Sequence, residues 1–344
     1  MTSDRIERRK QRWRDFYEGR GPRFMFLIDV GDPMADRPRP APENRDGQID
    51  CALRYYERRC GQLAWLDDDM IPYLDMHTGT EIFAEAFGCR VHQSPDSTPF
   101  ALPMIHDASQ VSGLRVPKYS SSPLARQFEV ADELRRRAGQ DVLMRVPDIQ
   151  SPIDIAALIW DKNEFFPAMV EHPEAVKELA AKVTSLFCGF LDAWFARYGR
   201  EFLAHYPRYY MPLGITLSED EAGAVGCAMF KEFFLPELVE LSNRYGRMGI
   251  HCCAHARHQW ELFKRVPNLV LMNLHPSREI LQEAWSCFAE VCPQMHPGWW
   301  QGPPEDWPRQ IPAGARAVFE VTVENEDRAR EVAEQLNHLR DTVA

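Results

Sequence analysis

The sequence lacks the features of secreted, membrane-spanning and nucleic-acid-binding proteins. Residues 1–23 are rich in charge and contain no apolar core of the kind found in a signal peptide. No later run reaches the roughly 18 consecutive apolar residues of a membrane span. Basic residues are outnumbered, because 40 Lys and Arg stand against 51 Asp and Glu and give a net charge of −11. We therefore expect a soluble, cytoplasmic protein that binds neither membranes nor nucleic acid.

Paired cysteine spacings and glycine-rich phosphate-binding turns are also missing. The nine cysteines are an odd number and are scattered over a long chain. This pattern argues against a disulfide framework and leaves thiols available for metal binding or chemistry. Neither a Gly-x-Gly-x-x-Gly turn nor a Walker motif occurs, although a doubly wound nucleotide-binding sheet would show one after a strand. These absences favour another α/β architecture.

Eight short apolar runs alternate with stretches of helical pattern. This alternation is typical of a (β/α)₈ TIM barrel, so we expect residues 1–344 to form one such domain, with residues 1–22 as an N-terminal helical extension. Residues 32–46 and 90–117 are rich in proline and charge and are expected to be loops at the rims, the first a candidate lid. The expected strands are residues 24–31, 70–76, 141–150, 209–216, 248–254, 269–276, 288–297 and 317–323.

Titratable side chains gather near the C-terminal ends of these expected strands. The active sites of TIM barrels lie at that end, so these side chains are the candidates for substrate binding and catalysis. They are Asp29, Asp75, Asp148, Glu219, Asp220, His251, Cys253, His275, His296 and Glu320, with Gln150 just beyond the third strand.

The run at 248–254 has the most specific pattern, because it ends in His251, Cys252 and Cys253. Successive residues of a strand point to opposite faces, so His251 and Cys253 share one face and Cys252 lies on the other. An imidazole beside a thiolate suits zinc, which takes nitrogen and sulfur ligands. The alternative is structural: buried cysteines often act as small hydrophobic residues, and the histidine then satisfies a hydrogen bond in the core.

Several segments together resemble the uroporphyrinogen decarboxylase superfamily, and within it the zinc-dependent, corrinoid-linked methyltransferases more than the true decarboxylases. They are residues 79–89, 150–156, 229–246 and 251–253. The resemblance implies a TIM barrel and a zinc ion bound by His251 and Cys253. It also implies a thiolate acceptor on that zinc, and a methylated corrinoid supplied by a partner protein.

Two departures from the superfamily pattern shape this interpretation. The decarboxylases have an arginine pair after the first strand, whereas this chain has Asp29-Val-Gly-Asp-Pro, so porphyrinogen decarboxylation is not expected. The methyltransferases have a second cysteine near the end of the last strand, which residues 317–324 lack. Glu320 stands at about that place and is the favoured third ligand, with His296 as the alternative.

The remaining candidates are assigned by residue type. Asp75, Glu219 and Asp220 are expected to act in acid–base catalysis, although the last two would equally favour the N-terminus of a following helix. Substrate binding is expected from Asp29, Gln150, His275 and His296.

The sequence thus predicts transfer of a methyl group between a corrinoid on a partner protein and a small acceptor activated at zinc. Two other classes stay open. One is a metal-independent decarboxylase or lyase acting on a different small substrate, and the other is a non-catalytic binding subunit. The oligomeric state is also open, a homodimer included.

Overall fold

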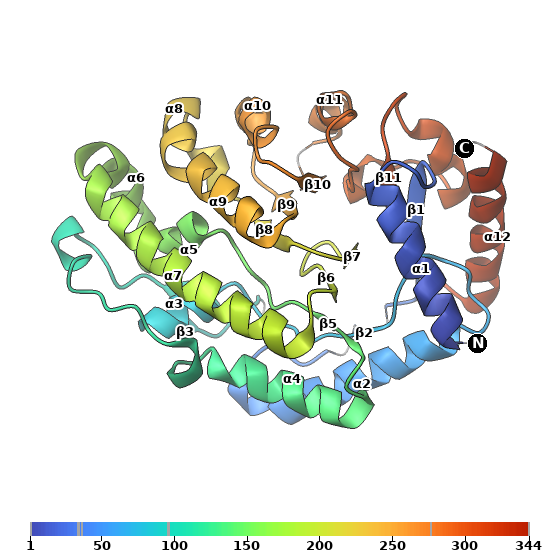
Figure 1. The fold of residues 1–344 in the computed structure, drawn as a ribbon, viewed down its shortest axis with the longest axis horizontal. Helices are drawn as coiled ribbons and strands as arrows, with labels where there is room; N and C mark the ends of the chain where they lie inside the picture. Colours follow the sequence, from blue (N-terminus) through green and yellow to red (C-terminus); the bar gives the residue numbers. More distant parts are fainter. Residues whose placement is uncertain (1, 33–34, 36, 95–96, 276, 343–344) are drawn as a thin grey trace.

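Short parallel strands line the inside of the molecule and helices surround them (Figure 1). The structure is a computed structural model that describes residues 2–32, 35, 37–94, 97–275 and 277–342. Parts of the expected 32–46, 90–117 and 269–276 segments, namely residues 33, 34, 36, 95, 96 and 276, lie outside the described residues. The helices are α1 (Thr2–Tyr17), α2 (Arg45–Gln62), α3 (Ile82–Phe87), α4 (Ala125–Ala138), α5 (Pro152–Ile159), α6 (Lys162–Glu171), α7 (Pro173–Tyr198), α8 (Cys227–Met229), α9 (Leu235–Tyr245), α10 (Trp260–Phe263), α11 (Arg278–Phe288) and α12 (Glu326–Thr342).

The strands form three mainly parallel groups and one hairpin. In the first group β1 (Phe24–Val30) pairs with β11 (Ala317–Val323). The second group has the order β10 (Leu269–Leu274), β9 (Met248–Cys252), β8 (Ile215–Ser218). The third contains β2 (Tyr73–Leu74), β5 (Leu143–Arg145) and β6 (Phe202–Leu203), with β7 (Tyr210–Met211) antiparallel to β6. The hairpin is β3 (Arg90–His92) with β4 (Phe100–Leu102).

The α/β class is confirmed, but a closed eight-stranded barrel is not shown by the strands that the structure describes. The expected strand at 288–297 is wrong as a strand: Phe288 ends α11, and Gln294 alone makes isolated bridges to Met272 and Ala317. Pro293 and Pro297 explain this, because proline donates no hydrogen bond to a ladder. The expected strand at 209–216 is split into β7 and β8. Strand β6 and the β3–β4 hairpin were not predicted from the sequence.

One helix is unusually long and apolar. Helix α7 is long and apolar enough, by length and composition, to cross a membrane. However, 56% of its most apolar window is buried inside the protein, where Phe187, Phe190 and Trp194 belong to the core. A core helix of a globular protein has the same properties, so α7 is weak evidence for a membrane span.

Two adjacent aspartates hold the N-terminal helix, β1 and the C-terminal helix together. Asp69 accepts a hydrogen bond from the Phe26 backbone N–H (2.9 Å) and ion pairs with Arg12 of α1 (2.5 Å) and Arg340 of α12 (2.8 Å). Asp68 accepts from the Ile28 backbone N–H at 3.0 Å. On this edge of β1, therefore, carboxylates replace the backbone of a neighbouring strand. Burial by itself would raise the pKa of Asp69, but the two arginines lower it, so the carboxylate stays ionised.

Because Asp69 serves three elements at once, we expect Asp69→Asn to destabilise the protein by about 3–5 kcal/mol, the usual cost of removing one partner of a buried ion pair. Urea-induced unfolding measures this. The matched control is Asp67→Asn, at an exposed side chain two residues away, for which we expect a change within about 0.5 kcal/mol. Equal midpoints for the two variants would contradict the assigned role of Asp69.

Candidate metal centre

Three potential metal ligands meet at the C-terminal ends of β8 and β9. Asp220 follows β8, His251 lies in β9, and Cys253 follows it directly. One ligand atom from each lies within 4.8 Å of those of the other two. The juxtaposition follows from the register, because β8 and β9 are parallel with Ser218 beside His251, and the ends of parallel neighbours meet at one edge. The structure therefore brings the expected His251–Cys253 pair together with Asp220.

Hydrogen bonds fix the orientation of the His251 ring. The Asn273 side-chain amide donates to the Met295 carbonyl, so its oxygen faces the His251 Nδ1, with which it is hydrogen-bonded. An amide oxygen only accepts, which assigns the proton to Nδ1 and leaves Nε2 with its lone pair free. A histidine that donates from one nitrogen and offers the other is the usual form of a metal ligand. The Tyr206 ring packs edge-on against the imidazole at 4.7 Å.

The two cysteines of this segment differ as the strand alternation predicts. Cys253 is exposed and lies in the three-residue group, whereas Cys252 is fully buried on the other face of β9. Partial desolvation of the sulfur, with Asp220 adding to it, raises the pKa of the Cys253 thiol to about 12. The thiol is thus protonated in the absence of a cation, and a metal ion would have to displace that proton. Asp220 accepts a hydrogen bond from the Cys253 backbone N–H at 2.6 Å, which ties the two ligand segments together.

Two cavities that share part of their walls open beside this group. The first, the His251 cavity, has a volume of about 350 Å³ and is lined by His251, Asp220, Asp148, His205 and Ser218, among others. The second, the Arg208 cavity, has a volume of about 500 Å³ and is lined by Asp29, Tyr73, Arg208, Glu320 and Thr322, among others. Both are bounded by Arg37, Asp75, Arg145 and Tyr206. Together they are large enough for a small-molecule substrate.

Every expected carboxylate of the Arg208 cavity is paired with arginine. Asp75 pairs with Arg145 (2.7 Å) and Arg37 (2.8 Å), and burial is outweighed so that its pKa lies well below the usual range. Asp29 pairs with Arg59 and Arg208. A carboxylate held ionised in this way is a poor proton acceptor, so its arginine partners disfavour the acid–base role expected of Asp75, which stays a prediction.

Glu320, the expected third ligand, lies elsewhere. Its carboxylate pairs with Arg208 at 2.7 Å, and it is not part of the group formed by Asp220, His251 and Cys253. His296, the alternative, is fully buried: its Nδ1 accepts from the Leu274 backbone N–H, and its Nε2 lies 2.9 Å from the Gln294 side-chain oxygen. Both ring nitrogens are therefore engaged, and burial lowers the pKa of His296 to about 3, which keeps the ring neutral.

The other expected residues are spread over different surroundings. Glu219 is fully buried, and its pKa is raised well above the usual range by burial and by Asp154. Gln150 is buried beside Ser218, and His275 is exposed. Of the four substrate-binding candidates, therefore, Asp29 lines the described cavities, whereas Gln150, His275 and His296 are absent from the described linings.

Several cavity residues that were not predicted from the sequence come from the β6–β7 hairpin or are arginines. His205, Tyr206 and Arg208 lie between β6 and β7 and line the cavities. His205 is buried with its nitrogens 3.2 Å from the Thr216 hydroxyl and 3.0 Å from the Ser218 hydroxyl. The available signal was the polar segment 205–208 directly after the apolar pair of β6. A two-residue strand gives no periodicity by which to recognise it.

We expect Cys253→Ser and Asp220→Asn to lower bound zinc from about one ion per chain to a small fraction, because each removes one of three gathered ligands. Cys252→Ser and Glu320→Gln are the matched controls and should keep the full content. Metal analysis of protein purified without a histidine tag measures the effect. Equal loss from both cysteine variants, or full retention by Asp220→Asn, would refute the assigned ligand set.

A second prediction concerns the orientation of His251. Asn273→Ala removes the hydrogen bond to Nδ1 without removing a ligand, so zinc should bind about 10–100-fold more weakly. Competition with a chromogenic chelator measures the affinity. Unchanged affinity would show that the ring is held by other contacts.

One solved structure and one family model support the fold. A methyltransferase from Methanosarcina mazei is similar in structure, with a TM-score of 0.66 and 13% identity over 97% of this chain and 98% of the other. The oxidised homocysteine methyltransferase MmuM of Escherichia coli matches with a TM-score of only 0.26 and 12% identity, over 68% and 90% of the two chains. No curated protein matches the sequence significantly. The family model for uroporphyrinogen decarboxylase (URO-D) matches residues 68–294, and the chain therefore belongs to the uroporphyrinogen decarboxylase family.

Proposed function

We propose that this protein is a zinc-dependent methyltransferase that moves a methyl group from a corrinoid on a partner protein to a small acceptor, such as a thiol. The observation that carries the proposal is the group formed by Asp220, His251 and Cys253, of which Asp220 and His251 line the His251 cavity. Family membership and the overall likeness to a methyltransferase structure support the fold on which it rests.

The chemistry of the three ligands fits zinc. They offer one oxygen, one nitrogen and one sulfur, and three protein ligands leave the fourth position of a catalytic zinc site open. When bound there, zinc would lower the pKa of an acceptor thiol so that it reacts as the thiolate. The Asn273 amide prepares His251 for this role, because it keeps the Nε2 lone pair free.

The cavities favour a small acceptor that carries charge of both signs. Arg37, Arg145 and Arg208 line the Arg208 cavity together with carboxylates that they largely neutralise. Such alternating charges can bind an anionic and a cationic group of one molecule at fixed positions. A corrinoid ring is larger than either cavity, which supports presentation of the methyl donor from outside by a partner.

The proposed reaction is a direct displacement. The acceptor thiol loses its proton to solvent, its sulfur attacks the methyl carbon, and a carbon–sulfur bond forms. The carbon–cobalt bond breaks, with its electron pair left on the cobalt of the donor. We also propose a cytoplasmic location, because all nine cysteines are free thiols in the described part of the chain.

The test combines zinc-loaded protein, free methylcobalamin as donor and a panel of small thiols with carboxylate, sulfonate or ammonium groups. The rate of methylcobalamin demethylation is measured by absorption spectroscopy. We expect it to fall about 100-fold in Cys253→Ser and to stay near the wild-type rate in Cys252→Ser.

Other outcomes separate the remaining classes. Protein that binds no zinc but releases carbon dioxide from small carboxylic acids would replace the proposal with a decarboxylase. Protein that binds no zinc and shows neither reaction would indicate a non-catalytic binding subunit.

A further inference from the structure

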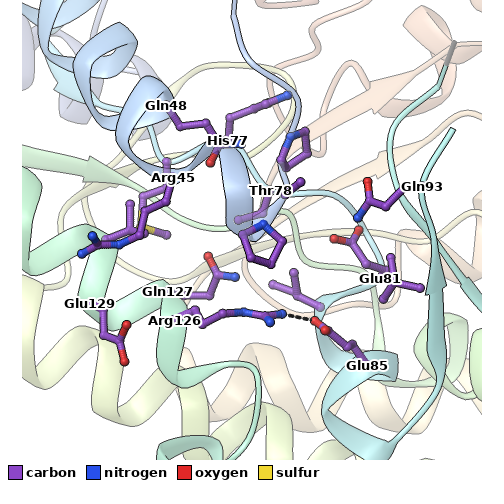
Figure 2. Close-up of a pocket in the computed structure, with 17 residues that line it drawn as sticks. Arg45, Gln48, His77, Thr78, Glu81, Glu85, Gln93, Arg126, Gln127 and Glu129 are labelled. Atoms are coloured by element: carbon purple, nitrogen blue, oxygen red, sulfur yellow. Dashed lines mark hydrogen bonds and ion pairs between the residues drawn. The ribbon is translucent and has the colours of Figure 1, made fainter. Parts of the chain in front are cut away.

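A second pocket lies beside the His251 cavity. Figure 2 shows it between α3, α4 and the segment that leads into α2; its volume is about 140 Å³. His77 and Thr78 form part of its wall and also line the His251 cavity. We call it the Glu81 pocket.

Glu81 is the unusual group in this pocket. The residue is only 6% exposed, and its Oε2 has no hydrogen-bond partner among the described residues. Its carboxyl group is turned toward the pocket (Figure 2). A glycine at position 79 makes this placement possible, because a Cβ there would lie 2.1 Å from Oε2. A buried acceptor without a partner costs about 1–3 kcal/mol, so a ligand that donates to it would recover that free energy.

The cations around Glu81 do not neutralise it. Arg126 pairs with Glu85, as the dashed line in Figure 2 marks. Arg45 is at the exposed end of the pocket and lies 3.5 Å from Asp46. His77 is neutral near physiological pH, because burial, Arg37 and Arg145 lower its pKa to about 4. Burial and the nearby acids Glu85 and Asp148 raise the pKa of Glu81 to about 7 and outweigh the lowering effect of Arg126, so the burial of this carboxyl group is not compensated by a cation.

We propose that the Glu81 pocket binds a small organic cation, a primary ammonium on a short apolar chain. The ammonium N–H groups would donate to Glu81 Oε2 and to the side-chain oxygens of Gln93 or Gln127, which share the pocket. The chain would lie against apolar residues of the wall, Met76, Ile82, Val91 and Val130. A protein cavity of about 150 Å³ holds a molecule the size of benzene, so about five or six non-hydrogen atoms fit.

The site is distinct from the proposed zinc centre and does not depend on methyl transfer. Its charged group comes from the turn before α3, whereas the zinc ligands come from β8 and β9. Because His77 and Thr78 separate the two spaces, a bound cation would lie directly beside the His251 cavity.

Calorimetric titration of the full chain tests the proposal, with n-butylammonium as the probe and n-butanol and butyrate as its neutral and anionic counterparts. About pH 8 is suitable, because it lies above the pKa of Glu81 and below that of an alkylamine. The wild-type protein should bind butylammonium at least about tenfold more tightly than either counterpart, the usual effect of a hydrogen bond to a charged group. Undetectable butylammonium binding, or equal binding of butyrate, would overturn the proposal.

Two variants and a control locate the binding. Glu81→Gln keeps the shape of the side chain but removes its charge, and should weaken butylammonium binding about tenfold or more. Gly79→Ala should do the same, because the new Cβ displaces the carboxyl group. The control Glu43→Gln makes the same charge change at an exposed residue outside the lining of the pocket and should leave affinity within about twofold. Wild-type affinity in a folded Glu81→Gln or Gly79→Ala variant would refute the site.

Discussion

The structure depends on carboxylates that accept hydrogen bonds from backbone N–H groups where no neighbouring strand can do so. A buried N–H without an acceptor is costly, so each break in the sheet needs a side chain to cover it. Asp68 and Asp69 cover the N–H groups of Ile28 and Phe26 on one edge of β1. Asp154 accepts from the backbone N–H groups of Asp220 (2.6 Å) and Glu221 (3.1 Å) after β8.

The same constraint builds the candidate metal centre. Asp154 holds the backbone of Asp220 in place, and Asp220 in turn accepts from the Cys253 N–H, which joins the ends of β8 and β9. Asn273 spans from His251 to the Met295 carbonyl and thus connects β9 with the segment that stands where a further strand would run. Asp154 and Asn273 therefore fix two of the three ligands, the first by holding the backbone of Asp220 and the second by holding the ring of His251.

Part of this arrangement could be predicted from the sequence. Each residue whose place was not predicted has a local physical reason. Strand alternation was enough to place His251 and Cys253 together and Cys252 apart. Asp220 was recognised only as an acid at a strand end, because its proximity to Cys253 depends on the register between two strands. Glu320 was favoured as the third ligand because of its place in the last strand. Its carboxylate instead pairs with Arg208, which comes from a hairpin whose strands are too short to show a pattern.

The positions of the arginines could not be predicted from the number of charged residues in the sequence. They distinguish the Arg208 cavity, in which the expected acids are paired, from the pocket that contains Glu81. The net charge of the chain is −11, yet Asp29, Asp75 and Glu320 are matched by arginines from distant parts of the chain. By contrast, Glu81 Oε2 has no hydrogen-bond partner among the residues that the structure describes. An acid that its protein already neutralises can shape a cavity, whereas an acid buried beside a small pocket without a paired cation recovers part of its desolvation cost when a cation enters.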